Sequence, residues 1–174
     1  IHEITAGIPG TWITRGSGQE SITAIRSPAL TGPGSCGSFL FLEDGVAIRP
    51  TGFCNVNETF EMLSELASAI EVIRGPGAAL WGANAVNGVI NIITKEARAT
   101  QGGQATVSAG NEERVGGSLC WGGDVGGSGN YRVWSKGLRR EATDDASNID
   151  PNHSARAGFR YDNALGEGSR VSVV

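Results

Sequence analysis

The sequence has no run of about 18 or more consecutive apolar residues, the length that a membrane-spanning helix needs. A transmembrane helix is therefore excluded. Transmembrane β-strands are not, because they are only about ten residues long and alternate apolar with polar residues. The opening residues, IHEITAGIPG, also lack the basic start and the long apolar segment of a signal peptide. We expect such a start for a mature or truncated product.

Basic residues are outnumbered by acidic ones, 14 against 18, so that the formal net charge is −4. A nucleic-acid-binding surface normally shows a basic excess, and this class of partner is therefore excluded. Hydrophobic residues make up 39%, below the usual share, while the 27 glycines are about twice the usual number. This composition predicts short strands and many turns.

The sequence carries no pattern of catalytic or metal-binding residues. A G-x-S-x-G nucleophile motif is absent, and neither His2 nor His153 has a cysteine or histidine at metal-ligand spacing. The loop with Asp144, Asp145 and Asp150 lacks the regular spacing of a calcium-binding loop, and we interpret it as a solvated acidic loop. We therefore expect no enzyme activity, no metal site and no cofactor.

Cysteine is scarce, with Cys36, Cys54 and Cys120 as the three examples. Their spacing fits no zinc pattern, because zinc sites need close pairs such as C-x-x-C. Two interpretations of Cys36 and Cys54 stay open. They form a disulfide, which would stabilise the fold by roughly 3 kcal/mol, or they are two buried thiols. Cys120 is interpreted as an unpaired strand residue.

The first 95 residues predict a small α+β domain. The stretches SITAIRS, SFLFLEDG, IEVIR and GVINIIT are short, β-branched or aromatic, and bounded by turn residues, as strands are. A turn is expected at Asp44-Gly45. Asn57 offers a helix N-cap, and Phe60, Leu63 and Ala67 recur at helical spacing, so a helix is expected over ETFEMLSELASA.

After Glu96 the pattern changes to alternation with period two, which predicts five strands in QATVSA, RVGGSLCWGG, NYRVWSKGLRRE, SARAGFRYD and RVSVV. The predicted domains are therefore 1–95, a linker over 96–102, and strands over 103–174. In SARAGFRYD, apolar residues from Ala155 to Tyr161 share one face, opposite Arg156 and Arg160. A soluble antiparallel sheet also alternates, but the small, charged second face and the aromatic residues near strand ends favour a barrel wall.

The stretch IEVIRGPGAALWGANAVNGVINIITK, residues 70–95, packs glycines between two strand-like ends. A phosphate-binding P-loop needs Lys and Ser/Thr after its second glycine, where Ala83 and Asn84 stand. A dinucleotide-binding loop needs glycine at position 80, which is leucine. Both phosphate-binding readings fail. The glycines are therefore interpreted as residues that let one strand turn tightly and return as another.

The same stretch resembles the signature that ends the plug domain of TonB-dependent outer-membrane receptors, [VI]-E-V-[IL]-R-G-P-x-S-x-L-Y-G-x-x-A-x-G-G-V-I-N-I-x-T-K. The departures are Ala78 for serine, Trp81 for tyrosine and Asn87 for glycine. Trp81 keeps the aromatic bulk, and asparagine is the residue that best replaces glycine at positive φ.

The resemblance extends over essentially the whole chain. EITAGIPGTWITRG is similar to the family's early P-G-V segment, with Thr11 for valine, and ITAIRS is similar to its I-x-I-R-G strand, with Ser27 for glycine. FLFLEDGVAI is similar to V-L-V-D-G-V. From Gln101 onward the chain is similar to the first barrel strands of these receptors.

This resemblance implies an α+β plug domain, a small mixed sheet with short helices, followed by antiparallel β-strands of an incomplete transmembrane β-barrel. Such barrels have about 22 strands, and an open sheet of about five would leave unpaired edges in lipid, so the chain is expected to be a fragment. The implied function is energised uptake of a scarce solute, such as a siderophore or other metal chelate, across the bacterial outer membrane. The alternative is a surface-binding or signalling receptor on the same scaffold, without transport.

The implied partners are TonB, reached through a segment upstream of this chain, an extracellular small-molecule ligand and outer-membrane lipid. Arg26 and Arg74 match family arginines that pair with barrel glutamates and lock the plug in place, and Glu71 is expected to join them. The alternative is that these are solvated strand-edge residues.

Ligands of this family meet the apical loops of the plug, which correspond to residues 30–35 and 49–53. The ligand-contact candidates there are Pro33, Arg49, Thr51 and Phe53, with ordinary loop exposure as the alternative. Cys36 and Cys54 stand at the inner ends of these two loops, so a disulfide would fix the loops relative to each other.

Overall fold

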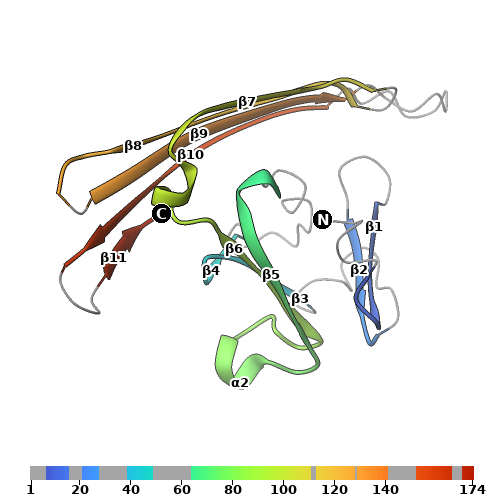
Figure 1. Ribbon diagram of the computed structural model, residues 1–174. Helices are drawn as coiled ribbons and strands as arrows, with labels where there is room; N and C mark the ends of the chain where they lie inside the picture. Colours follow the sequence, from blue (N-terminus) through green and yellow to red (C-terminus); the bar gives the residue numbers. More distant parts are fainter. Residues whose placement is uncertain are drawn as a thin grey trace. The chain divides into compact units, whose positions relative to one another are not determined.

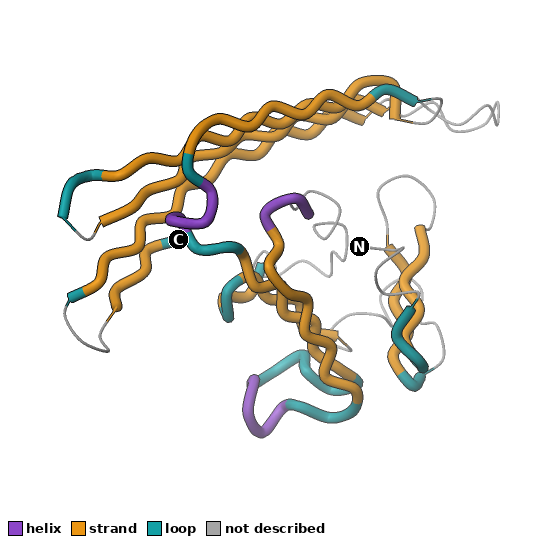
Figure 2. The backbone as a smooth tube through the Cα atoms, in the orientation of Figure 1, coloured by secondary structure: helices purple, strands orange, loops and turns teal. Residues whose placement is uncertain are grey.

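The computed structural model describes residues 7–15, 21–27, 39–48, 64–110, 113–127, 129–140, 152–165 and 170–174 (Figures 1 and 2). The chain divides into two compact units, Ile1–Thr94 and Lys95–Val174. Within the described ranges, no helix has the length and apolar character needed to cross a membrane.

The first unit contains a hairpin and a four-stranded mixed sheet. Strands β1 (Thr11–Arg15) and β2 (Ser21–Ile25) pair antiparallel. The sheet has the order β4-β3-β6-β5 and is built from β3 (Phe39–Glu43), β4 (Val46–Ala47), β5 (Ala67–Arg74) and β6 (Gly88–Thr94). The β3 and β6 pair is parallel, and the other two pairs are antiparallel. The four strands predicted in this half are therefore confirmed, as is the turn at Asp44-Gly45.

Strand β6 is the centre of this unit because its two faces meet two different apolar clusters. Ile90 and Ile92 pack with Phe39 and Phe41 of β3 and with the hairpin residues Ile13 and Ile25. On the other face, Val89 packs with Leu40, Leu42 and Ala85. A strand that is covered on both faces reads as a continuous apolar run, which is how GVINIIT appears in the sequence.

The helix expected over ETFEMLSELASA is wrong at its C-terminal end. Residues 51–63 lie outside the described part of the chain, Ser64–Leu66 form the short 3-10 helix η3, and β5 begins at Ala67. Ala67 pairs with Thr94 and Ala69 with Ile93, across a bulge in the register. The backbone N–H and C=O groups along the edge of β6 thus pair with these residues, and this tertiary pairing overrides their helix propensity.

The glycine-rich stretch between β5 and β6 is the tight return that the sequence predicts. Gly75 and Gly82 adopt φ of +119° and +80°, a region open to glycine at little cost. Between them lies the four-residue helix α2 (Ala78–Trp81). The expected positive φ at Asn87 is wrong, since Asn84 adopts it instead, at +75°. Asn87 accepts a hydrogen bond from Gly75 N through its carbonyl oxygen, 3.0 Å away, and so closes the base of the loop.

The second unit is an antiparallel sheet of five strands in the order β11-β10-β9-β8-β7, so the predicted number and pairing of strands are confirmed. The strands are β7 (Gly102–Ser108), β8 (Glu113–Asp124), β9 (Gly129–Arg140), β10 (Asn152–Ala164) and β11 (Arg170–Val173). A 3-10 helix, η4 (Ala97–Thr100), precedes β7 and lies in the stretch predicted as a linker.

The two faces of this sheet differ in chemistry. One, the apolar face, exposes large hydrophobic side chains to the surface, and carries Leu119, Trp121, Val133 and Phe159 with the small residues Ala105, Ala155 and Ala157. The other, the polar face, carries Thr106, Gly122, Arg132, Arg160 and Asp162, of which the two arginines and the aspartate are buried. The alternation predicted for β10 is therefore present, with Ala155, Ala157 and Phe159 exposed and Arg160 buried.

Candidate functional site

The two arginines singled out in the sequence meet at one turn of the first unit, Ile8–Gly10. Arg74, the last residue of β5, donates a hydrogen bond from Nη1 to the carbonyl oxygen of Pro9, 2.7 Å away. Arg26 follows β2, and its backbone N–H donates to the carbonyl oxygen of Gly10 at 2.8 Å. The side chain of Arg26 lies so near Gly10 that a Cβ placed there would be 3.4 Å from the arginine Cγ. Three segments far apart in the sequence are thereby joined at this turn.

Arg26 also lines a shallow depression of about 490 Å³ beside the turn, together with Thr11, Trp12 and Ser27. Arg26 adopts φ of +49°, which is unusual for a residue other than glycine. The Oγ1 of Thr11 is buried without a hydrogen-bond partner in the described structure. The guanidinium of Arg26 and the hydroxyl group of Ser27 beside one depression are suited to binding a carboxylate.

A polar network joins the three strands β5, β6 and β3 through Asn91, which is only 6% exposed. Its Nδ2 donates to Oε2 of Glu71 at 3.2 Å, directly across the β5 and β6 ladder. Its Oδ1 accepts from the backbone N–H of Gly45 at 3.1 Å, in the turn after β3. A buried amide with partners on both sides fixes the register of the strands that supply those partners.

The neighbouring residue of that turn, Asp44, holds the end of β6. Its carboxylate accepts two hydrogen bonds from Thr94, at 2.8 Å from the backbone N and 2.6 Å from Oγ1. The backbone N–H of Asp44 donates to the carbonyl oxygen of Ile92 at 2.9 Å. Hydrogen bonds to an ionised carboxylate are roughly twice as strong as neutral ones, so this turn is fastened tightly to β6.

The sequence predicted a role for Glu71 but not for Asn91 or Asp44. One signal was present in each case. An asparagine inside the buried run GVINIIT needs buried partners, and Asp44-Gly45 was read only as a turn.

The candidates Pro33, Arg49, Thr51 and Phe53, and the pair Cys36 and Cys54, lie outside the described residues. In the part of the chain that the structure describes, Cys120 is a free, half-buried thiol, and no cluster of three or more His, Cys, Asp or Glu residues is arranged to hold a metal ion.

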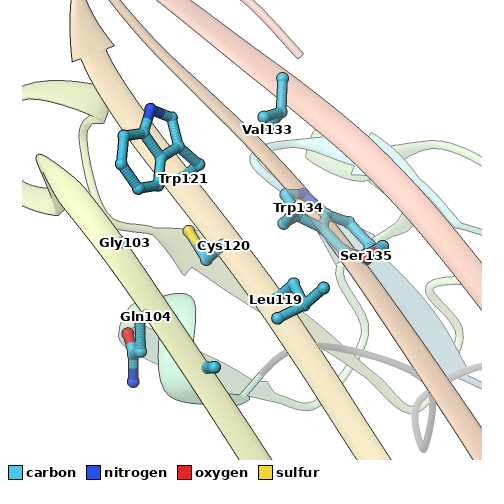
Figure 3. Close-up of a pocket in the computed structure, with 9 residues that line it drawn as sticks. Gly103, Gln104, Leu119, Cys120, Trp121, Val133, Trp134 and Ser135 are labelled. Carbon is cyan, nitrogen blue, oxygen red and sulfur yellow. The ribbon is translucent and has the colours of Figure 1, made fainter.

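The second unit offers a groove of about 610 Å³ that crosses β7, β8 and β9 and is lined largely by apolar groups, including Leu119, Trp121 and Val133 (Figure 3). Trp121 lies directly opposite Gly103 in the ladder, and a Cβ on that glycine would be 2.8 Å from the indole ring. The glycine thus makes room for the tryptophan on the sheet surface, an arrangement that pins register. Such a groove suits hydrocarbon better than a polar solute.

We predict that Asn91→Ala costs about 1–3 kcal/mol in the local free energy of opening of β3, β5 and β6, because it removes the two hydrogen bonds that a buried amide makes to Glu71 and to the backbone N–H of Gly45. Glu71→Gln is the matched control, since Glu71 is exposed and glutamine keeps an acceptor oxygen, and its cost should stay below about 0.5 kcal/mol. Hydrogen exchange of the peptides covering these strands measures both costs. Equal effects of the two substitutions would contradict the assigned role of Asn91.

Comparisons with known proteins agree with this architecture. A sequence model of the TonB-dependent receptor plug domain matches residues 1–89. The copper transporter OprC is similar in structure, with a TM-score of 0.69 and 20% identity over 98% of this chain and 26% of its own. The ferric yersiniabactin uptake receptor FyuA from Yersinia pestis is similar with a TM-score of 0.62 and 17% identity, over 94% of this chain and 26% of its own.

The chain thus spans about a quarter of the length of both proteins. At such identities the likeness shows the fold alone, which is the expected plug domain followed by antiparallel strands of an incomplete β-barrel. The sequence model covers more than half of the 174 residues and shows the family itself. The chain belongs to the TonB-dependent receptor plug domain family.

Proposed function

We propose that this chain is the plug and the first wall strands of an outer-membrane receptor that takes up a scarce solute with energy supplied through TonB. The observation that carries the proposal is the joining, within one chain of this family, of a plug sheet to five antiparallel strands with a continuous apolar face. Proteins of the family are transporters of the outer membrane. A sheet that presents one apolar and one polar face is what a barrel wall between lipid and an internal plug requires.

The proposed cargo is a metal chelate such as a ferric siderophore, or the metal ion itself. Two structural neighbours support this class, because one is named as a copper transporter and the other as a ferric yersiniabactin uptake receptor. Arg49 and Phe53, in one of the apical loops, remain the proposed contacts for an anionic and a flat aromatic part of such a chelate.

The test is accumulation of radiolabelled ferric siderophores and of radiolabelled copper by cells that carry the complete receptor. We expect accumulation of one of these solutes that is lost when either the receptor or TonB is deleted. Binding at the cell surface that persists without TonB and leads to no accumulation would contradict transport. That outcome would favour the surface-binding or signalling role.

Arg26 and Arg74 are proposed to lock the plug to barrel carboxylates. Two features support the proposal. Both side chains are exposed at the Ile8–Gly10 turn, and Arg26 lines a depression whose polar groups suit a carboxylate. Glu71 is proposed to belong to the same polar surface, although its described hydrogen bond is to Asn91.

We expect the double substitution Arg26→Ala and Arg74→Ala to leave ligand binding largely intact but to raise leakage of a large antibiotic such as vancomycin through the receptor. The loss of both charges removes the carboxylate contacts, and a more loosely held plug opens a passage. Arg74→Lys keeps the charge and a donor for Pro9, and should not leak. Arg98→Ala is a second control, because Arg98 is an exposed arginine whose described ion pair is with the nearby Glu96. Leakage equal to wild type in the double variant would rule out the lock.

The apolar face of the five-stranded sheet is proposed to meet lipid, and a matched pair of lysine substitutions tests this. Ala157 lies on that face, and the row through Ser135 and Leu119 leads across the sheet to Ala105. Thr106, the next residue of β7, lies on the polar face at nearly the same level. Ala157→Lys should cost about 2–4 kcal/mol of folding free energy in a bilayer, and Thr106→Lys much less.

Folding of the complete receptor into lipid vesicles, followed over a urea series, measures both costs. Gly158 is adjacent to Ala157 but is no fair control, because any Cβ there would lie 2.7 Å from the indole of Trp134. A larger cost for Thr106→Lys than for Ala157→Lys would mean that the polar face meets the lipid.

A further inference from the structure

The peptide bond between Thr94 and Lys95 is where the chain passes from the first unit to the second, and each unit holds its own side of it. In the first unit, Asp44 binds both the backbone N and the Oγ1 of Thr94. In the second unit, Nη1 of Arg132 donates to the carbonyl oxygen of Lys95, 2.6 Å away. Arg132 is 1% exposed, so this donor is a buried side chain of the sheet and not a surface side chain.

The residues after the junction, Lys95–Gln101, are fastened to the polar face of the five-stranded sheet, and we call them the tether. Their buried Ala97 donates its backbone N–H to Oδ2 of Asp162 at 2.7 Å. This N–H belongs to the first turn of η4, whose own N-cap residue, Glu96, makes no side-chain capping hydrogen bond. A carboxylate from β10 therefore does the work of a helix cap.

Gly122 of β8 makes room for the tether. A Cβ on this residue would overlap the carbonyl oxygen of Thr100 and lie 3.3 Å from Cα of Gln101. The backbone of the tether therefore runs directly against the sheet at a point where no other residue type fits. This contact is steric and independent of the charged contacts made by Arg132 and Asp162.

Two buried arginines and one buried aspartate, Arg132, Arg160 and Asp162, lie on this part of the sheet. Arg132 and Arg160 are directly opposite in the ladder of β9 and β10, and like charges in that position repel. Asp162 compensates one of them, with both carboxylate oxygens 3.0 Å from Nε of Arg160. Arg132 is directed to the carbonyl oxygen of Lys95. Buried charges are stabilised by such partners, and the tether supplies one of them to Arg132 and one to Asp162.

We propose that Gly122, Arg132 and Asp162 are positioning residues that bind the tether to the polar face of the five-stranded sheet, so that the connection from the plug is fixed to the barrel wall from Lys95 onward. This rests on the proposed function as a plugged receptor. A force on the plug is then transmitted to the sheet at this junction, while the tether stays bound. Each freed residue would add up to about 3.5 Å of reach, so release of the tether would let the plug move on the order of 20 Å farther.

The test is limited trypsin digestion of the complete, folded receptor, because Lys95 and Arg98 both place cleavage sites in the tether. Proteolysis of a locally opened segment follows the population of the open form. We expect Asp162→Ala and Gly122→Ala each to speed cleavage after Lys95 or Arg98 by at least about tenfold, the effect of losing one buried hydrogen bond or its steric equivalent. Thermal unfolding of the barrel measures its overall stability and should change little in Gly122→Ala, whereas Asp162→Ala also removes a partner of the buried Arg160 and should lower it.

Two further variants separate a positioning role from a general loss of charge. Arg132→Lys keeps a donor for Lys95 and should retain most of the protection. Arg156→Gln removes an arginine from the same strand as Asp162, at a distance from the tether in the ladder, and should cleave like wild type. If Asp162→Ala does not fold, Gly122→Ala alone decides.

Wild-type cleavage rates in the folded Gly122→Ala receptor would overturn the proposal, as would equally fast cleavage of Arg156→Gln. The digestion needs no transport and no ligand. A receptor that fails to take up any solute but shows the expected cleavage pattern would therefore contradict the proposed function while supporting the tether.

Discussion

Strand β6 is the constraint on which the first unit depends. Like β3, it has ladder partners on both edges and contributes to both apolar clusters, and its own partners are β3 and β5. Its amide residue, Asn91, ties β5 to the turn after β3, and its last residue, Thr94, is held by that same turn. The polar groups along β6 therefore specify register, while the apolar groups supply most of the burial free energy.

In the second unit, too, polar and apolar groups have separate roles. The five-stranded sheet keeps its large apolar side chains on one face and concentrates its buried charges on the other, close to the tether. Glycines serve both faces in one way, by making room: Gly103 for an indole ring, and Gly122 for backbone. In the proposed barrel, a wall strand would meet lipid on one face and a polar interior on the other, and the small residues let both faces pack closely.

Most of the strand pattern could be predicted from the sequence, because period-two alternation and short β-branched runs are local signals. The end of the expected helix could not, since Ala67 and Ala69 have helix propensity and become strand only through pairing with Thr94 and Ile93 of β6. The resemblance singled out Arg26 and Arg74 separately. That both contact the Ile8–Gly10 turn could not be predicted, because the contact depends on the three-dimensional fold. Asp162 and Ala97 are 65 residues apart, and no local pattern connects them.

The central claim is that a plug and the first strands of its barrel are joined in this chain, and a cryo-electron microscopy structure of the complete receptor in lipid nanodiscs tests it most directly. The account predicts that residues 1–94 lie within a closed barrel to which β7–β11 contribute consecutive strands. Leu119, Trp121 and Phe159 should then face lipid, and Arg132 should still contact the carbonyl oxygen of Lys95. A sheet that stays open, or an apolar face covered by another part of the protein, would contradict it.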